Sequence, residues 1–354
     1  MKILVQRFLL LFINFVEILL KMNSFGLSFR VSIFGESHGE GIGIVLDGVP
    51  QGISLSGADF DTDIARRSSG ARGAAARGEI GTTGTTPRIE ADEAHILSGV
   101  FNGHTTGAPL AIIFHNNNTR STDYQQFSIM PRPGHADYVA SVKWGNDNDP
   151  RGGGHFSGRI TLPIVAAGVI AKKILGNVKV SAELIAIGGC EDRGKWQELL
   201  KATAAEGDSL GGIIECTVDN VPVGLGEPFF DSVESLISHA IFSIPGIRGI
   251  EFGDGFRAAA MKGSEHNDPF GECGPEKNGC GGANGGISNG AQIKFRVAVK
   301  PTSSIAKAQQ TWNFEEGRMD TLKIKGRHDT CFALRTPVIV EAMTAIVLAD
   351  LILR

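Results

Sequence analysis

The segment "PVIVEAMTAIVLADLIL", which begins at Pro337, constrains the fold of this chain more than any other feature of the sequence. Its pattern predicts a long helix, and its residues are apolar on nearly every side. A helix that is hydrophobic all round has no face suited to water, so other elements must cover it. We therefore expect this C-terminal segment to form a buried helix.

Strands and two further helices are predicted elsewhere in the chain. "LPIVAAGVIAKKIL", from Leu162, has an early proline and late lysines, as helices favour. "DSVESLISHAIFSI" opens with Asp231 and has Glu234 three residues later, which resembles a capping box. Strands are predicted where apolar residues alternate with others and share one face: Phe29, Val31 and Ile33; Ile42, Ile44 and Leu46; and Ile293, Phe295, Val297 and Val299.

Two pairs of short segments echo each other along the chain. "LDGVPQG" from Leu46 resembles "VDNVPVG" from Val218, and "FGES" from Phe34 resembles "FGDG" from Phe252. Either the likeness is chance, or an internal duplication packs two related α/β units on one core. No proline- or serine-rich linker divides the chain. We expect one compact α+β domain over residues 22–354.

The apolar segment 1–21, "MKILVQRFLLLFINFVEILLK", has three interpretations. As a signal peptide, it lacks a small-residue cleavage pattern after it. As a membrane span, it is marginal in length and is interrupted by Asn14 and Glu17. The interpretation that we favour is that translation begins at Met22 and that the extension is not normally made.

Charge and cysteine content argue against several classes of protein. The net charge is −4, so no global positive field marks the chain as a nucleic-acid binder. The five cysteines are odd in number and include no CxxC, which argues against a disulfide framework or a structural zinc site and favours a reducing cytosol. HxH and HExxH spacings are also absent, so we expect no metal ligands.

Three long segments are predicted to be functional loops or disordered: residues 66–88, 145–158 and 263–290. The first, "RRSSGARGAAARGEIGTTGTTPR", is rich in arginine. Its arginines could be solvated surface residues or an RNA-binding patch. Alternatively, guanidinium groups on turns can capture phosphate and carboxylate groups in pairs of hydrogen bonds. The arginines considered for this role are Arg66, Arg67, Arg72, Arg77, Arg132, Arg159, Arg327 and Arg335.

Two of the nine histidines stand beside a glycine and close to a carboxylate. His38 lies in "ESHGE" with Glu36, and His135 lies in "RPGHADY" with Asp137. An imidazole is the best proton donor or acceptor near neutral pH, so both are candidate acid–base groups. "GGANGGISNG" and "KPTSS", which spans 300–304, could cradle a phosphate with backbone amides, a lysine and hydroxyl groups. Neither segment is a Walker A loop or a GxGxxG fingerprint.

Several segments resemble the chorismate synthase family and occur in the family's order from about Phe25 to the C-terminus. They are "FGESHGEGIGIVLDGVPQGI", "ILSGVFNGHTTGAPLAI", "RPGHADY", "RGGG", "GLGEPFFD", "GISNG", "KPTSSI" and "GRHD". Each is weak alone, whereas the ordered set is highly specific. The family usually begins a few residues before the "FRV" strand, which is why we favour Met22 as the start.

The resemblance implies a fold, a reaction and partners. The fold would be a β-α-β sandwich with long glycine-rich active-site loops, in a cytoplasmic homotetramer that binds neither membrane nor nucleic acid. The reaction would be the elimination of phosphate and a C6 hydrogen from 5-enolpyruvylshikimate 3-phosphate to give chorismate. Reduced FMN is required without net redox change, and NADPH is a candidate reductant.

The resemblance also assigns residues by motif. Arg67, Arg132, Arg159 and Arg327 would hold the substrate, with Arg72 or Arg77 assisting. His135 would protonate the leaving phosphate, His38 would pair with the reduced flavin, Asp329 would receive the proton from C6, and Ser37 and Ser157 would hydrogen-bond within these relays. The positions expected to contact FMN are His155, Phe156, Ser157, Gly246, Gly285, Lys300, Pro301, Thr302, Ser303, Ser304 and Arg327.

Three segments depart from the family pattern. "HFSGRIT" stands where many relatives read "RSSARET", so His155 and Phe156 replace an arginine and a serine. "RRSSG" replaces a common "RRRPG", and "PGIRG" at Pro245 differs from a turn that more often contains asparagine. Two other hypotheses are therefore a related flavin oxidoreductase without elimination activity and an RNA-binding protein that uses "RRSSGARGAAARG".

Overall fold

The computed structural model describes residues 23–79, 82–86, 90–117, 126–145, 147–272, 274–324, 326 and 328–354. The predicted extension 1–21, the start at Met22 and the predicted site residue Arg327 lie outside these ranges. No helix in the described part of the chain has both the length and the apolar character needed to cross a bilayer.

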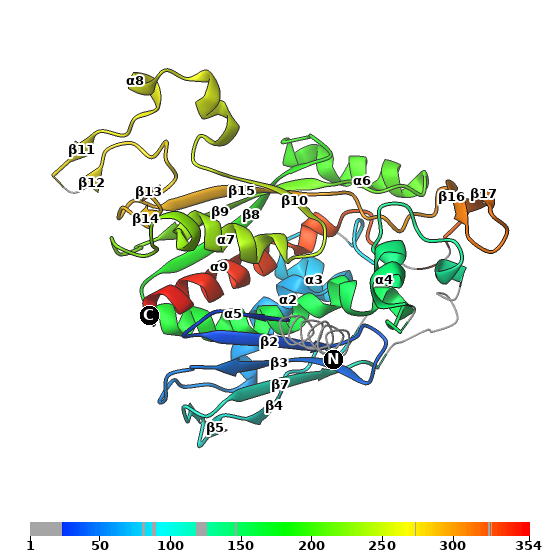
Figure 1. The fold of residues 1–354 in the computed structure, drawn as a ribbon, viewed down its shortest axis with the longest axis horizontal. Coiled ribbons are helices and arrows are strands. Elements are labelled where there is room, and N and C mark those ends of the chain that lie inside the picture. Colours follow the sequence, from blue (N-terminus) through cyan, green and yellow to red (C-terminus); the bar gives the residue numbers. More distant parts are fainter. Residues whose placement is uncertain are drawn as a thin grey trace, which may run out of the picture.

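Two antiparallel sheets enclose a layer of helices (Figure 1). The first sheet has the order β1 (Ser24–Phe25), β2 (Arg30–Gly35), β3 (Gly41–Asp47), β7 (Leu110–His115), β4 (His95–Ser98). The second has the order β10 (Ile247–Phe252), β15 (Ile293–Val299), β9 (Gly212–Asp219), β8 (Lys179–Ile187). The helices are α2 (Asp61–Arg67), α3 (Gly70–Ala76), α4 (Asp137–Trp144), α5 (Thr161–Leu175), α6 (Trp196–Ala205), α7 (Val233–Phe242), α8 (Gly263–His266) and α9 (Pro337–Ile352). The predicted α+β sandwich is confirmed.

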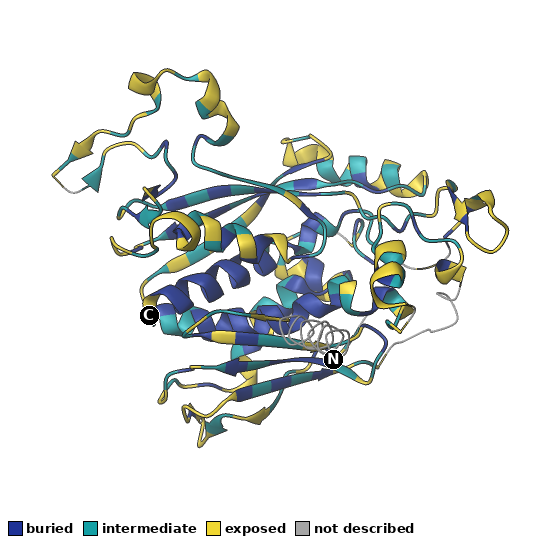
Figure 2. Ribbon diagram, in the orientation of Figure 1, coloured by how far each residue is buried: buried dark blue, intermediate teal, exposed yellow. Residues whose placement is uncertain are grey.

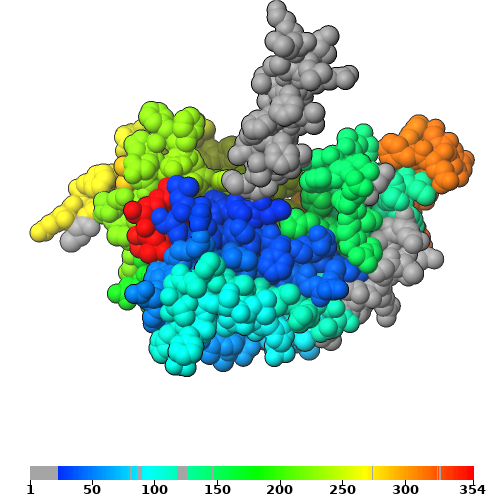
Figure 3. All heavy atoms as spheres, turned by 60° about the horizontal axis from the view of Figure 1, so that its bottom comes forward, coloured from blue at the N-terminus to red at the C-terminus, as the bar shows by residue number. Residues whose placement is uncertain are grey.

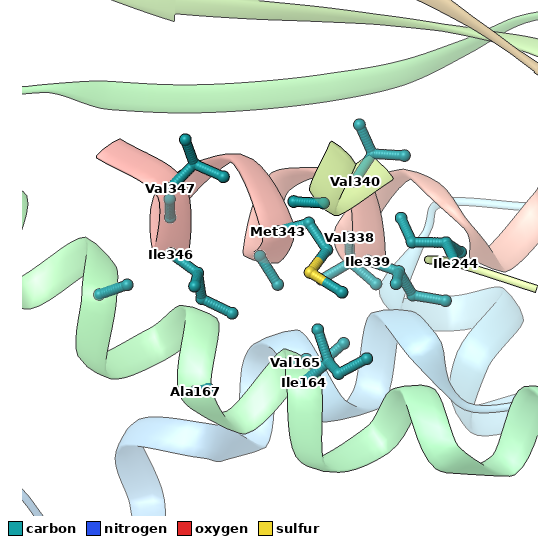
Figure 4. Close-up of a cluster of buried hydrophobic side chains, with 14 of the residues drawn as sticks. Ile164, Val165, Ala167, Ile244, Val338, Ile339, Val340, Met343, Ile346 and Val347 are labelled. Carbon is teal, nitrogen blue, oxygen red and sulfur yellow. The ribbon is translucent and has the colours of Figure 1, made fainter. Parts of the chain in front are cut away.

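Helix α9 is the buried helix predicted from its apolar sequence. It lies in the middle layer and is buried along almost its whole length (Figure 2). It packs on α5, where Ile164 and Val165 face Met343 and Ile346 (Figure 4). The two helices approach so closely at Gly168 that a Cβ there would lie 2.3 Å from the Cβ of Ala342. One continuous apolar core therefore joins both sheets through this helix pair.

The two halves of the chain share one topology. The order β2-β3-β7-β4 in the first sheet matches β8-β9-β15-β10 in the second, and each set of four strands is followed in the chain by a long central helix, α5 or α9. "LDGVPQG" and "VDNVPVG" both follow the second strand of their set, so this echo fits an internal duplication. The second predicted echo does not, because "FGES" ends β2 whereas "FGDG" ends β10, which corresponds to β4.

The single acidic side chain in the middle of α9 anchors α2. Glu341 accepts two hydrogen bonds from Arg66, at 2.6 and 2.8 Å, and one from the Lys172 Nζ at 2.9 Å. Burial alone would raise the pKa of this carboxyl group, but Arg66 and Lys172 together hold it below its usual value. Because Arg66 precedes Arg67 in α2, the network also fixes the end of the helix that carries Arg67.

Near the chain ends, the described N-terminal residues pack on the C-terminal helix. The Asp350 Oδ1 accepts hydrogen bonds from the backbone N–H groups of Leu27, Ser28 and Phe29 at 2.6 to 2.9 Å. Figure 3 shows the red C-terminal residues beside the blue ones that begin the first sheet. This contact closes one side of the middle layer.

Two local predictions were wrong. Residues 66–88 are not a loop throughout, because α2 extends to Arg67 and α3 spans Gly70–Ala76. Asp231 does not cap α7; Ser232 is the N-cap, and its Oγ accepts the N–H of Ser235 at 3.0 Å. Both errors have a tertiary cause: Arg77 ties α3 to α2 through the carbonyl groups of Arg66 and Ser68, and Asp231 instead pairs with Arg354.

Candidate active site

A cavity of about 720 Å³ lies where loops from both halves meet the middle layer, with residues of α5 and α9 in its wall. Among the described residues that line it, seven are basic and three are acidic. The basic ones are Arg67, Arg72, Arg132, Arg159, Arg248, Lys300 and Arg335, and the acidic ones are Glu90, Asp92 and Asp329. The chain as a whole is acidic, with a net charge of −4, so the positive charge is concentrated here. A site of this kind attracts ligands with several anionic groups.

Arg67 enters the cavity from the last turn of α2 and is only 3% exposed. Its Nε donates to the Thr161 Oγ1 at 3.0 Å, and its Nη2 donates to the Gly158 carbonyl oxygen at 2.7 Å. Burial and the nearby charge of Arg335 lower the pKa of Arg67 to about 9, so the group is still a cation at neutral pH. Its nearest acidic oxygen is 3.8 Å away, on Asp92.

Arg159 lies beside Arg67 and is tied to two other segments. It forms an ion pair with Asp92, and its Nε donates to the Asn116 Oδ1 at 3.0 Å. The Asn116 Nδ2 donates in turn to the carbonyl oxygens of Glu36 and Gly39, at 3.1 and 2.9 Å. Asn116 thus connects the arginine to the loop that carries Ser37 and His38.

On another wall, Asp137 orients a second arginine and the predicted proton donor. The Arg132 Nε and Nη2 each donate to one oxygen of Asp137 at 2.7 Å, and the Arg132 Nη1 donates to the Ser304 Oγ at 2.9 Å. The His135 Nδ1 lies 2.7 Å from the Asp137 Oδ1. Burial lowers the pKa of His135, and the attraction of Asp137 offsets this only in part. His135 therefore favours its neutral form in the free protein.

Asp329 occupies a third position on the cavity wall. Its Oδ1 accepts the backbone N–H of Thr86 at 2.8 Å, and its Oδ2 accepts a hydrogen bond from the Arg335 Nη2 at 2.7 Å. The ion pair is mostly buried, with the two side chains 8% and 12% exposed. It presents a fixed carboxylate to the cavity, which suits a proton acceptor.

The glycine run of residues 152–154 brings the backbone close to both predicted histidines. All three glycines have positive φ, at 61°, 82° and 52°. A Cβ on Gly152 would lie 2.1 Å from the His38 Nδ1, and a Cβ on Gly153 would lie 3.4 Å from the His135 ring. Gly152 lines the cavity, whereas His38 and Ser37 lie behind it.

The segment "KPTSS" lies on the cavity wall, as expected for a binding loop. The Lys300 Nζ donates to the Gly134 carbonyl oxygen at 2.6 Å, next to the segment that carries His135. Burial and the charge of Arg248 lower the pKa of Lys300. The Thr302 Oγ1 is buried and has no hydrogen-bond partner among the described residues.

Most of the predicted site residues come together at this cavity. Those that line it are Arg67, Arg72, Arg132, His135, His155, Phe156, Ser157, Arg159, Gly246, Lys300, Pro301, Thr302, Ser303, Ser304 and Asp329. Three described residues do not: Ser37 and His38, behind Gly152, and Gly285, which follows β13 (Ala283–Asn284). The roles assigned to these residues stay predictions.

The residues that depart from the family pattern make contacts of their own. The His155 Nδ1 lies 2.9 Å from the Gly35 carbonyl oxygen, and its Nε2 lies 3.2 Å from the Asn23 Oδ1. Phe156 packs against Trp144, with ring centroids 5.7 Å apart. His155 therefore joins the glycine run to the end of β2 while it lines the cavity.

The site residues that sequence reasoning missed include Asp92, Asn116 and Arg248, and Arg335 was not assigned a role. Arg335 was noted only as one of many arginines, and its place eight residues after Arg327 was the available signal. Asp92 lies among other acidic residues in "IEADEAH", and nothing in that pattern singles it out.

The predicted RNA-binding alternative receives no support from the arginine-rich segment. Arg66 is paired with Glu341, Arg67 is buried, and Arg77 donates to two backbone carbonyl groups and to Glu79. These arginines point into the protein rather than forming the exposed cationic surface that RNA requires. Within the described residues, no group of three or more His, Cys, Asp or Glu side chains could hold a metal ion.

Comparisons with known proteins agree with the site. A family model described as chorismate synthase matches residues 29–353. The chorismate synthase of Chitinophaga pinensis is 56% identical over 335 residues, which cover 94% of this chain and 97% of that one. The chorismate synthase of Korarchaeum cryptofilum is 45% identical, covering 93% and 97%. A crystal structure of chorismate synthase has a TM-score of 0.69 at 27% identity and covers 93% of each chain. This chain therefore belongs to the chorismate synthase family of enzymes.

Proposed function

We propose that this enzyme is a carbon–oxygen lyase that eliminates phosphate and a C6 hydrogen from 5-enolpyruvylshikimate 3-phosphate to give chorismate, by anti-1,4-elimination, with reduced FMN in the cavity. The observation that carries the proposal is the excess of basic over acidic side chains, seven to three, around one cavity of an acidic protein. The substrate bears a phosphate and two carboxylates. Several guanidinium groups fixed on separate walls can bind such a molecule in one orientation.

The residues divide into binding and proton-transfer groups. Arg67, Arg132 and Arg159 are held by neighbouring hydrogen bonds, so their guanidinium groups are oriented before a ligand arrives. Arg72 lies at the exposed edge of the same cavity and would assist. Arg327 keeps its predicted role as a further phosphate or flavin contact.

His135 would donate a proton to the departing phosphate. In the free protein, burial holds its pKa below the ordinary value, which limits its protonation at neutral pH. A phosphate placed beside the ring would favour the imidazolium form, because an opposite charge raises the pKa of a histidine. The proton would thus be taken up as the substrate binds, where it is needed.

Asp329 would receive the proton removed from C6. It lines the same cavity as His135, and its hydrogen bonds from Thr86 and Arg335 hold the carboxylate in one orientation. Ser157 also lines the cavity and could relay a hydrogen bond, whereas Ser37 would act with His38, 3.3 Å from its Nδ1.

The residues present also fit reduced FMN. Three buried polar atoms on residues that line the cavity have no hydrogen-bond partner among the described residues: the Thr302 Oγ1, the His328 Nε2 and the Arg335 Nε. Phe332, Ile244 and Met343 add an apolar wall against which a flat ring could lie. The chemistry expected of bound reduced FMN is transient electron donation to the reacting ring, without net redox change. Lys300, Pro301, Thr302, Ser303, Ser304, Gly246, His155 and Phe156 would hold it, with Gly285 as a further predicted contact.

A homotetramer in the cytoplasm completes the proposal. Phe229, Phe230 and Phe256 are 87%, 92% and 86% exposed in the single chain, and apolar side chains this exposed are common at interfaces between subunits. The four described cysteines are free, as in proteins of a reducing compartment.

The test is an anaerobic assay with 5-enolpyruvylshikimate 3-phosphate and dithionite-reduced FMN, following chorismate absorbance and phosphate release. We expect both signals together, and we expect Arg159→Gln to abolish them. Arg193→Gln, which alters an exposed ion pair with Glu183, is the matched control and should keep full activity. Binding of reduced FMN without phosphate release would support the flavin oxidoreductase instead. Repeating the assay with oxidised FMN and NADPH tests whether the enzyme reduces its own flavin.

A further inference from the structure

One acidic residue stands among the arginines that are proposed to bind the anionic substrate. Asp92 is 7% exposed and lines the cavity. It forms an ion pair with Arg159, and its Oδ2 lies 3.8 Å from the Arg67 Nη1. A carboxylate in this position neutralises part of the positive charge that a ligand carboxylate or phosphate would otherwise neutralise.

The backbone of Asp92 has an unusual conformation. Its φ is +51°, in the left-handed region that residues other than glycine seldom adopt, although aspartate and asparagine tolerate it best. Asp92 lies three residues before β4, and its carboxylate is buried at the cavity wall rather than exposed to solvent. Such strained positions persist where the surrounding structure requires them.

Three cations and two carboxylates are grouped around Asp92. Arg67, Arg159 and Arg335 contribute three buried or nearly buried cations, and Asp329 is already paired with Arg335. Asp92 is therefore shared by two arginines, of which Arg159 holds it more closely. Among these five side chains the cations outnumber the anions by one, and a ligand anion can meet the difference.

We infer that Asp92 is a positioning residue, a built-in counter-anion that holds Arg159 and Arg67 in place and limits how tightly the cavity binds anions. The inference rests on the proposed function only in taking this cavity as the site of an anionic substrate. Without Asp92, the arginines would repel each other and would hold any multivalent anion more firmly. Release of the product phosphate would then be slow.

The test uses Asp92→Asn, because asparagine has the same shape and tolerates positive φ. Asp47→Asn is the matched control, since Asp47 pairs with Arg30 at an exposed site on the first sheet. The probe is inorganic sulfate, titrated calorimetrically at pH 7 and constant ionic strength. We expect the sulfate affinity to rise about tenfold in Asp92→Asn and to be unchanged in Asp47→Asn.

A purely structural role for Asp92 would loosen the site and weaken sulfate binding, so an unchanged or lower affinity in folded Asp92→Asn overturns the inference. If the variant is unstable, sulfate should raise its melting temperature more than that of the parent, because the ion replaces the missing charge. An equal or smaller rise in melting temperature would also overturn the inference.

Kinetics separate this inference from the proposed function. If the parent enzyme makes chorismate, Asp92→Asn should lower both kcat and the KM for substrate and should make phosphate a stronger product inhibitor. If the parent makes none, the sulfate result still decides whether Asp92 restrains anion binding.

Discussion

At the scale of single residues, the glycine run beside the histidines gives the sharpest test. Gly152→Ala should abolish turnover, because the new methyl group would fall 2.1 Å from the His38 Nδ1 and displace the ring. Gly145→Ala is the matched control: Gly145 has the same φ of 61°, and nothing lies within 4 Å of its Cβ position. The control should lose about 1–2 kcal/mol of stability from left-handed strain alone. Steady-state kinetics of both variants check this, and equal losses of activity would contradict it.

His135 should make the fold sensitive to acid. Its pKa is lowered in the native state, so the unfolded chain binds a proton more readily than the folded one. The stability that this difference contributes is full above the unfolded pKa of about 6.5 and is lost as the pH falls below it. His135→Gln should therefore lose less stability than the parent between pH 7.5 and 5.5. Urea unfolding at both values measures this, with the exposed His104→Gln as a control that should behave like the parent.

Residue chemistry predicted most of the site but not its internal organisation. Arginines, glycines and the "RPGHADY" motif are visible in the sequence, and the structure gathers them around one cavity. Asp92 and Asn116 are not visible, because their roles depend on the distance to Arg159, which is remote in the chain. The glycine beside His38 is visible in the sequence, whereas the glycine that makes room for the ring is Gly152, on another segment.

At the scale of elements, the contact between α9 and α2 depends on one carboxylate. Glu341→Gln would remove a carboxylate that is only 5% exposed and would leave Arg66 and Lys172 paired with Asp63 alone. Removing one member of a buried ion pair typically destabilises a protein by about 3–5 kcal/mol. Because Asp63 still pairs with both cations, which are 26% and 27% exposed, we expect a loss at the lower end of this range at pH 7, measured by urea unfolding, and a raised KM because α2 carries Arg67.

The exposed pair Arg193–Glu183 supplies the control for that experiment. Glu183→Gln should change stability by less than about 1 kcal/mol, since solvent screens the interaction. If both substitutions have the same small effect, Glu341 does not hold the helices together.

The periodicity of apolar residues predicted the helices and strands that have a clear apolar pattern. It failed for elements that are held in place by tertiary contacts. α5, α7, α9 and β15 all lie where the pattern placed them. α3 was missed because its sequence, "GARGAAA", has no amphipathic face; Arg77 and the cover of neighbouring segments hold it in place instead.

At the scale of the whole molecule, one core runs through both halves, so the chain should unfold as a unit. The apolar cluster extends from Phe29 in the first sheet to Leu351 at the end of α9. We expect urea unfolding curves from tryptophan fluorescence and far-ultraviolet circular dichroism to coincide. Two separate transitions would indicate that the duplicated halves are independent domains.

Of the two echoes in the sequence, only one reflects the relation between the two halves. One echo, "LDGVPQG" with "VDNVPVG", marks equivalent turns, and the other joins turns that are not equivalent. The strand order is the stronger support for a duplication, because the two sheets repeat one order of strands. The two halves are therefore more alike in strand order than in sequence.

The contacts of Gly152 and Gly153 place one segment of backbone against both His38 and His135, the two predicted acid–base residues. Successive Cα atoms are about 3.8 Å apart, and here one glycine meets His38 while the next meets His135. Two neighbouring backbone positions of one segment therefore pack against both rings. A residue inserted into or deleted from the run would therefore change the packing against His38 and His135 together.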